Sequence, residues 1–313
     1  MPEPRPQPDP HERRRGVYYA VAAFGLWGLA PIYFKAVAAV APLEVLAHRI
    51  LWSVLLLGAL LWLSGRRQSL GALLRQRRHL AGLMLSALLI SVNWGVFIWA
   101  VGNQRILETS LGYFINPLVS LLLGLLFLGE RLRPPQWLAI ALMGVAVGYQ
   151  LLLLGRLPAV ALALALSFGF YGLVRKKLAL DPIIGLFMET LLLLPLALFY
   201  LGWSQRQGTL AFSADGGELS LLLMAAGVVT TLPLLCFAAA TVRLSLTWLG
   251  LVQYLAPSIA FLLAVLYYHE PLDGARLLTF VLIWIALGLF SAEGWWHKRR
   301  RPAALPQSPP AAG

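Results

Sequence analysis

Long apolar runs between charged residues recur along this 313-residue chain and constrain its fold more than any other feature. About 20 apolar residues cross the roughly 30 Å hydrocarbon core of a bilayer as an α-helix. Backbone groups in lipid have to bond within their own segment, so runs of this length predict helices. The sequence therefore predicts an all-α integral membrane protein. Its ten expected transmembrane helices cover residues 16–37, 44–64, 80–102, 106–128, 137–155, 158–174, 183–203, 219–242, 245–268 and 276–296.

The composition agrees with a membrane protein, since 59% of the residues are hydrophobic and only 12% are charged. A soluble domain has about 25% charged residues, so an ordinary soluble enzyme is excluded. A net charge of +12 on a soluble chain would suggest nucleic acid, but on a membrane chain it marks cytoplasmic loops. We therefore expect a multi-pass protein with both termini cytoplasmic and no nucleic-acid partner. With the termini inside, the Lys and Arg residues left outside are Lys35, Arg49, Arg105, Arg156, Arg206 and Arg276.

The two halves of the chain resemble each other. A shift of 140 residues pairs Pro42 with Pro182 and Glu130 with Glu270, among other matches. Each half then holds five spans, and an odd number makes the second half enter the membrane in the opposite sense. We expect two inverted five-helix repeats, residues 16–155 and 156–296, between disordered cytoplasmic tails at 1–15 and 297–313. Such an architecture is typical of transporters that open alternately to each side.

Motifs for other chemistry are missing from the sequence. It has no Walker loop, no nucleophile elbow and no His-Glu-x-x-His pattern. The lone Cys236 excludes an intramolecular disulfide and a thiolate metal cluster. We therefore expect no cofactor, no metal site and no ATP-driven pump. Secondary transport of a small molecule is the favoured function, and a membrane-embedded enzyme or sensor with the same polar residues is the alternative.

Glu189 is the acidic residue that lies most clearly inside a predicted span. A charge at membrane depth is costly, so it faces a partner or a water-filled cavity. Two interpretations stay open: a carboxylate that accepts a proton or binds a cation, or a structural ion pair with Arg175 or Lys176. The 140-residue shift places Glu189 on Arg49, and inverted halves would put these charges toward opposite faces. That arrangement suits two gates better than one direct pair.

Further polar residues interrupt the apolar helices. In the second span Glu44, His48 and Trp52 share one face beside Arg49, either as a proton shuttle or among lipid headgroups. In the third span Ser86 and Asn93 form a small polar stripe, and Asn93 would contact substrate or bond a neighbouring helix. The remaining polar candidates along the substrate or coupling-ion pathway are Tyr113, Asn116, Thr231, Gln253 and Tyr254.

Proline and glycine mark expected bends and contacts. Pro117 and Pro257 occupy matching positions of the two halves, where freed carbonyl groups point to a binding site or to a bend used for packing. Pro31 and Pro233 predict further bends. Gly144 and Gly148 form a small-xxx-small pair, which predicts a close helix contact.

These residues give the chain a family resemblance. It resembles the RarD-type proteins of the EamA family, in the drug/metabolite transporter superfamily, over nearly all of residues 16–296. The motifs that carry the resemblance are His48-Arg49 with Trp52-Ser53, Asn93-Trp94, the run Leu111-Gly112-Tyr113-Phe114-Ile115-Asn116-Pro117-Leu118, Gly129-Glu130-Arg131, Phe170-Tyr171-Gly172-Leu173-Val174-Arg175-Lys176-Lys177, Glu189-Thr190, Thr230-Thr231, and Gln253-Tyr254 with Pro257.

The resemblance implies ten helices in a bacterial inner membrane and a small-molecule carrier without a settled substrate. It adds Trp94 and Tyr171 to the candidate pathway residues. One departure is Gly102, where relatives often have Asn, and this weakens a substrate-binding role for that position. Direction of transport, coupling ion and oligomeric state are left open, including whether protons are coupled.

Overall fold

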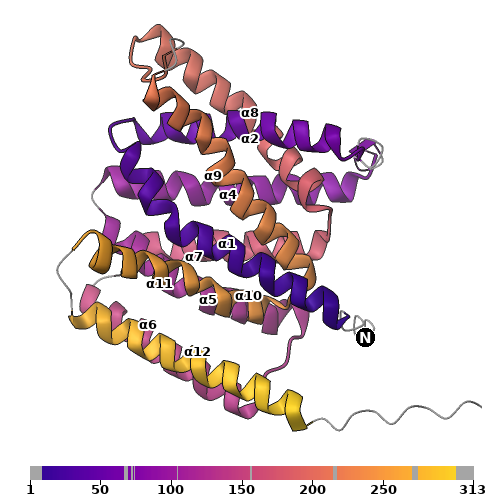
Figure 1. Ribbon diagram of the computed structural model, residues 1–313, viewed down its shortest axis with the longest axis vertical. Helices are drawn as coiled ribbons and strands as arrows, with labels where there is room; N and C mark the ends of the chain where they lie inside the picture. The colour runs from indigo at the N-terminus through magenta and orange to yellow at the C-terminus, as the bar shows by residue number, and fades with distance from the viewer. Residues whose placement is uncertain are drawn as a thin grey trace, which may run out of the picture.

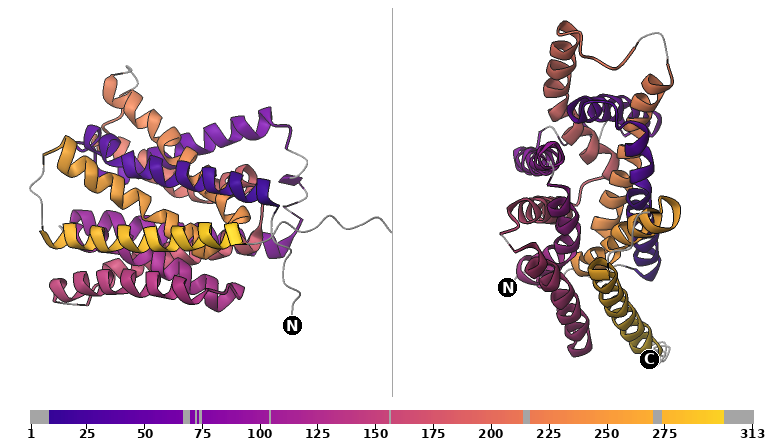
Figure 2. Two further views of the ribbon diagram at one scale, coloured as in Figure 1. Left: turned by 60° about the horizontal axis from the view of Figure 1, so that its bottom comes forward. Right: turned by 90° about the vertical axis from the view of Figure 1, so that its left-hand side faces the viewer.

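The computed structural model describes residues 9–66, 70–71, 73, 75–103, 105–155, 157–213, 217–269 and 274–300. These residues form a bundle of helices without a strand (Figures 1 and 2). The helices are α1 (Pro10–Ala36), α2 (Pro42–Leu63), α4 (Arg77–Gly102), α5 (Ile106–Leu128), α6 (Pro134–Leu154), α7 (Ala159–Leu178), α8 (Pro182–Arg206), α9 (Glu218–Arg243), α10 (Leu246–Gln253), α11 (Leu255–Leu262), the π-helix η1 (Leu263–Tyr267) and α12 (Gly274–Arg300).

The expected membrane spans are present as helices. In the described part of the chain nine segments are long and apolar enough to cross a membrane, with α10, α11 and η1 forming one of them. The helix α12 contains a shorter apolar segment, Leu277–Glu293. The start of α1 and the end of α12 lie on the same side of the bundle in both figures, as an even number of crossings requires. The all-helical, multi-span membrane fold is therefore confirmed.

The first and the last helix extend into the segments that the sequence predicts as tails. The helix α1 starts at Pro10, because the Asp9 side chain accepts a hydrogen bond from the His11 amide at 3.4 Å and proline suits the first helical turn. Residues 10–15 are thus helical and not disordered, and so are residues 297–300 at the end of α12. The rest of both predicted tails, 1–8 and 301–313, lies outside the described residues, as do Gln104, Arg156 and Glu270.

The prolines act differently in the two halves. Pro257 lacks the amide hydrogen that would bond the Gln253 carbonyl, and the ninth span is interrupted there, between α10 and α11. Its counterpart α5 continues through Pro117, and α1 and α9 continue through Pro31 and Pro233. The two prolines at matching positions therefore differ, because one follows an interruption and the other lies in a continuous helix, and bending at the three uninterrupted sites stays a prediction.

The most extensive helix contacts are symmetric under exchange of the two halves. When the helices α1, α2, α4, α5 and α6 are exchanged with α7, α8, α9, α10–α11 and α12, the contact of α1 with α9 becomes that of α7 with α4. Likewise α2 with α9 becomes α8 with α4, and α1 with α11 becomes α7 with α5. The pairs α2–α8, α5–α10 and α6–α12 exchange with themselves, and α6 and α12 lie side by side at one edge of Figure 1.

The pair α2–α8 is antiparallel. The end of α2 packs on the beginning of α8, where Leu61 joins the cluster of Ile184 and Met188. A Cβ added at Gly58 would lie 3.6 Å from the Phe187 ring, which gives the same register. This pairing places the eighth residue of α2, Arg49, and the eighth residue of α8, Glu189, near opposite ends of the contact between the two helices.

The glycine pair Gly144 and Gly148 does not form a helix contact. Among the described residues, nothing lies within 4 Å of a Cβ placed at either position. Close approaches occur instead at Gly227, against the α2 backbone, and at Gly250, against the carbonyl of Pro117. The prediction from the small-xxx-small spacing is wrong because spacing does not show which face of a helix meets a neighbour.

Glu130 caps the first turn of α10. One carboxylate oxygen accepts from the Leu246 amide at 2.6 Å, and the other accepts from the Thr247 amide at 2.9 Å. We expect Glu130→Ala to lower the free energy of unfolding by about 1–2 kcal/mol, since two amides at a helix start lose an anionic acceptor. Thermal unfolding in detergent measures this, with Glu218→Ala at the exposed start of α9 as the control. Equal losses in both variants would contradict the capping role.

Candidate functional site

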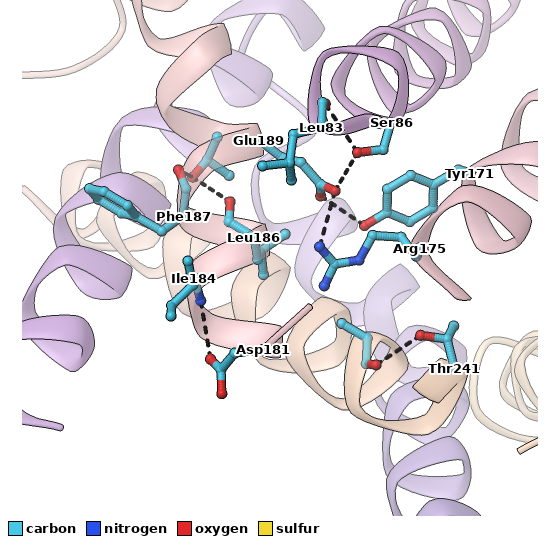
Figure 3. A network of polar contacts seen from close by, with 12 residues as sticks. Leu83, Ser86, Tyr171, Arg175, Asp181, Ile184, Leu186, Phe187, Glu189 and Thr241 are labelled. Atoms are coloured by element: carbon cyan, nitrogen blue, oxygen red, sulfur yellow. Dashed lines mark hydrogen bonds and ion pairs between the residues drawn. The ribbon is translucent and has the colours of Figure 1, made fainter. Parts of the chain in front are cut away.

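Glu189 lies at the centre of a buried polar network between α4, α7 and α8 (Figure 3). One of its carboxylate oxygens accepts from the Ser86 hydroxyl at 2.6 Å and from the Arg175 guanidinium at 3.1 Å. The other accepts from the Tyr171 hydroxyl at 3.1 Å. All four side chains are buried, and Glu189 is 1% exposed. We call these residues, Ser86, Tyr171, Arg175 and Glu189, the Glu189 network.

Local sequence positions this network. Asp181 caps the start of α8, accepting from the Ile183 and Ile184 amides at 3.0 and 3.2 Å. Gly185 follows one turn later, and a Cβ there would collide with the Arg175 guanidinium. The glycine therefore gives the arginine room to reach Glu189, which lies one further turn along the same helix.

The network matches the structural ion-pair interpretation of Glu189, with Arg175 as the partner. The alternative partner Lys176 donates instead to the carbonyls of Thr241 and Leu244 at the end of α9. Both oxygens of Glu189 are used, and its charge is balanced by a guanidinium. A carboxylate with both oxygens bonded and its charge balanced is better suited to a structural role than to accepting a proton.

Arg49 has a different environment. It is half-buried in α2, and its Nε donates to the Thr230 hydroxyl of α9 at 2.7 Å. Its guanidinium lies over the ring of Trp94 from α4, at 4.9 Å, and over Phe34 from α1, at 5.8 Å. No carboxylate in the described part of the chain forms an ion pair with it. Among the described residues, cation–π contacts with two aromatic rings and one hydrogen bond to a hydroxyl therefore stabilise this positive charge.

Two tyrosines complete the surroundings of Arg49. The phenol groups of Tyr33 and Tyr113 are near enough to interact electrostatically with the guanidinium. Tyr113 lies in α5, and its side chain is 51% exposed. Asn116, one turn further along α5, is half-buried, and its Oδ1 has no hydrogen-bond partner among the described residues. We define the Arg49 site as Tyr33, Phe34, Arg49, Trp94, Tyr113 and Thr230.

His48 and Trp52 lie beside this site on α2, as their spacing predicts. The Trp52 indole donates to Nδ1 of His48 at 3.2 Å, so the ring proton of a neutral His48 is on Nε2. That nitrogen is 3.9 Å from Glu44, and the His48 ring stacks on Phe212. Glu44 is 1% exposed and accepts from the Ala211 and Phe212 amides, so it is buried in protein and not among headgroups.

Other predicted site residues bond neighbouring helices. Asn93 donates to the Leu164 carbonyl at 2.9 Å and to the Ser167 hydroxyl at 3.0 Å, which joins α4 to α7. Ser120 donates to Gln253 at 3.4 Å, and Tyr254 donates to the Phe114 carbonyl at 3.1 Å. Thr231 is 1% exposed, and its hydroxyl has no partner among the described residues. Of the two interpretations of Asn93, its contacts match the helix bond.

The two charged groups do not meet. In the antiparallel register of α2 and α8, Arg49 and Glu189 are offset by about seven residues, or roughly 10 Å along the helix axes. The sequence reasoning missed Phe34 and the bond from Ser86 to Glu189. Ser86 is 103 residues from Glu189 in the chain, and only its place on a polar stripe signalled a role. Within the described residues no group of three or more His, Cys, Asp or Glu is arranged to hold a metal ion.

Comparison with known proteins agrees with this fold. The model of the EamA-like transporter family matches residues 14–151 and again 158–292. The chain is 50% identical over 287 residues to an "Uncharacterized transporter" of Vibrio cholerae serotype O1, which covers 92% of this chain and 95% of that protein. It is 47% identical over 293 residues to "Protein RarD" of Salmonella typhi, covering 94% and 100%.

A solved crystal structure matches the fold with a TM-score of 0.67, at 18% identity, over 90% of this chain and 98% of the other. At this identity the match concerns the fold alone. The two matches to one family model fall on the two halves that the repeat predicts. The chain therefore belongs to the EamA-like transporter family, as a RarD-type, multi-span membrane transporter.

Proposed function

We propose that this protein is a secondary transporter that moves a small molecule by alternating access of two inverted halves, residues 16–155 and 156–296. The observation that carries the proposal is the symmetry of the helix contacts, because halves that pack through exchangeable contacts can exchange conformations. The proposed location is a bacterial inner membrane with both termini in the cytoplasm. The names of the relatives point to transport and not to catalysis.

Contacts between the halves support a gate at each end. At the end where α1 starts, Arg66 pairs with Asp181 at 2.5 Å, Arg243 pairs with Glu12 at 2.8 Å, and Ser86 bonds Glu189. At the other end Glu44 holds the amides of residues 211 and 212, and Arg49 bonds Thr230. Alternating access requires one set of contacts to open while the other stays closed. We assign the Glu189 network to the first gate and not to a proton path.

The test uses the full chain in proteoliposomes. A panel of labelled metabolites and drug-like molecules is screened for counterflow, and we expect at least one solute to exchange with saturation. A cysteine pair, Arg66→Cys with Asp181→Cys in a Cys236→Ser background, is then joined by a short disulfide-forming cross-linker. Because the link fixes one gate, we expect loss of exchange and its recovery after reduction.

Single-cysteine variants treated with the same reagent are the controls. Exchange that continues unchanged across the linked gate would contradict alternating access. A panel that yields no exchange at all, with a substrate consumed chemically in detergent, would favour the membrane-enzyme alternative instead.

A further inference from the structure

We propose that the Arg49 site binds the carboxylate of an organic acid whose apolar body lies among the surrounding aromatic rings. The inference rests on the proposed function in taking this acid to be the transported molecule. It starts from the charge of Arg49, which no described carboxylate balances. A cation at membrane depth is costly, and a bound anion would remove that cost.

The geometry leaves one edge of the guanidinium for a ligand. A guanidinium has five N–H donors, and Nε already donates to Thr230. The guanidinium carbon lies over the ring of Trp94, and the ring of Phe34 is near it as well. No described residue accepts a hydrogen bond from the two terminal amino groups, and these groups form the planar fork that binds a carboxylate through two parallel hydrogen bonds.

The neighbours favour a carboxylate over a phosphate. A phosphate monoester carries nearly two negative charges at pH 7, and its sites gather several cations or a helix start. Around Arg49 the described residues supply one guanidinium, the Thr230 hydroxyl and the phenols of Tyr33 and Tyr113. A site with one positive charge and neutral hydrogen-bonding groups suits a ligand that carries a single negative charge. The exposed ring of Tyr113 and the half-buried ring of Trp94 offer flat apolar surface to the rest of the molecule.

The position of the site also suits a transported molecule. Five helices contribute to it: α1, α2, α4 and α5 come from the first half, and α9, which carries Thr230, comes from the second half. The hydrogen bond from Arg49 to Thr230 thus crosses between the halves. A carboxylate on the guanidinium would be held at the boundary where the halves move relative to each other.

The experiment compares acids with their neutral amides. The probes are benzoate with benzamide, 3-phenylpropionate with 3-phenylpropionamide, and hexanoate with hexanamide. Binding to the purified full chain is measured by ligand-induced thermal stabilisation over a concentration series. We expect at least one acid to bind about tenfold or more tightly than its amide, because a hydrogen-bonded charge pair is lost in the amide.

Variants assign the preference to the arginine. Arg49→Gln is expected to abolish the preference for the acid, whereas Arg49→Lys keeps the charge without the fork and retains part of it. Arg133→Gln removes the same charge at the ion pair with Glu293, which belongs to neither gate, and is expected to leave the preference unchanged. If Arg49→Gln fails to fold, the intermediate affinity of Arg49→Lys decides the question.

A wild-type protein that binds none of the acids, or binds amides equally well, would overturn the inference. So would a preference for acids that survives in Arg49→Gln. Flux separates this result from the proposed function. Neutral solutes that exchange without any acid preference would overturn the carboxylate site alone. Acids that bind with the expected preference while no solute exchanges would overturn the transport proposal alone.

Discussion

Glu189→Gln is expected to lower the free energy of unfolding by about 3–5 kcal/mol, since it leaves the buried Arg175 guanidinium without its counter-charge. The amide oxygen can still accept from one of the Ser86 and Tyr171 hydroxyls, and the amide nitrogen can donate to the other, so the change removes charge more than shape. Thermal or denaturant unfolding of the purified protein in detergent at neutral pH measures the loss. Glu218→Gln, at the exposed start of α9, is the matched control and is expected to change stability little.

A double variant separates charge balance from a functional role. Glu189→Leu with Arg175→Met removes both charges together, and we expect it to recover much of the stability lost in Glu189→Gln. Recovery of that kind would place the pair in the structure of the gate. A Glu189→Gln protein that unfolds like the wild type but loses pH-driven flux would instead show that Glu189 couples transport to protons.

Gly227→Val is the second change with a large expected effect. A Cβ at Gly227 would lie 2.5 Å from the Trp52 Cβ and 2.7 Å from the Trp52 backbone carbon. Backbone cannot rotate away as a side chain can, so α2 has to shift from α9. We expect a loss of about 1–3 kcal/mol in the free energy of unfolding from overpacking. Thr230 lies one turn beyond Gly227, so the same shift would weaken its bond to Arg49 and with it the binding of acids.

The control for this change is Gly144→Val on α6. Nothing in the described structure lies within 4 Å of a Cβ at Gly144, so we expect the stability to stay within about 0.5 kcal/mol of the wild type. Unfolding curves and the acid-binding assay are run on both variants. Equal behaviour of the two would mean that α2 and α9 do not cross closely at Gly227.

Much of the fold could be read from the chain because lipid imposes a simple rule. Length and apolarity of a run decide whether it spans, so the expected spans at 44–64 and 183–203 match α2 and α8 closely. The errors fall where a local contact overrides that rule. Asp9 caps α1, so this helix begins before the charged residues that the sequence predicts to lie in the tail. The ninth span is interrupted near Pro257, whereas α5 continues through Pro117.

The sequence predicted many of the residues of the candidate site, but it did not predict which of them pair with each other. The sequence singled out Glu189 and Arg49 as charges inside spans and named Arg175 among two possible partners. Whether Asn93 faces a cavity or another helix depends on how α4 is rotated, and apolar helices encode rotation weakly, since lipid and protein interiors are alike apolar. The structure turns Asn93 toward Leu164 and Ser167.

The sequence by itself determined which segments cross the membrane, that two similar halves exist, and which few residues carry charge at depth. Only the tertiary structure decided that Glu189 is balanced by Arg175 while Arg49 has aromatic rings and Thr230 around it. The physical reason is that hydropathy is a property of one segment alone. The partner of a buried charge depends on the register and rotation of helices that are far apart in the chain.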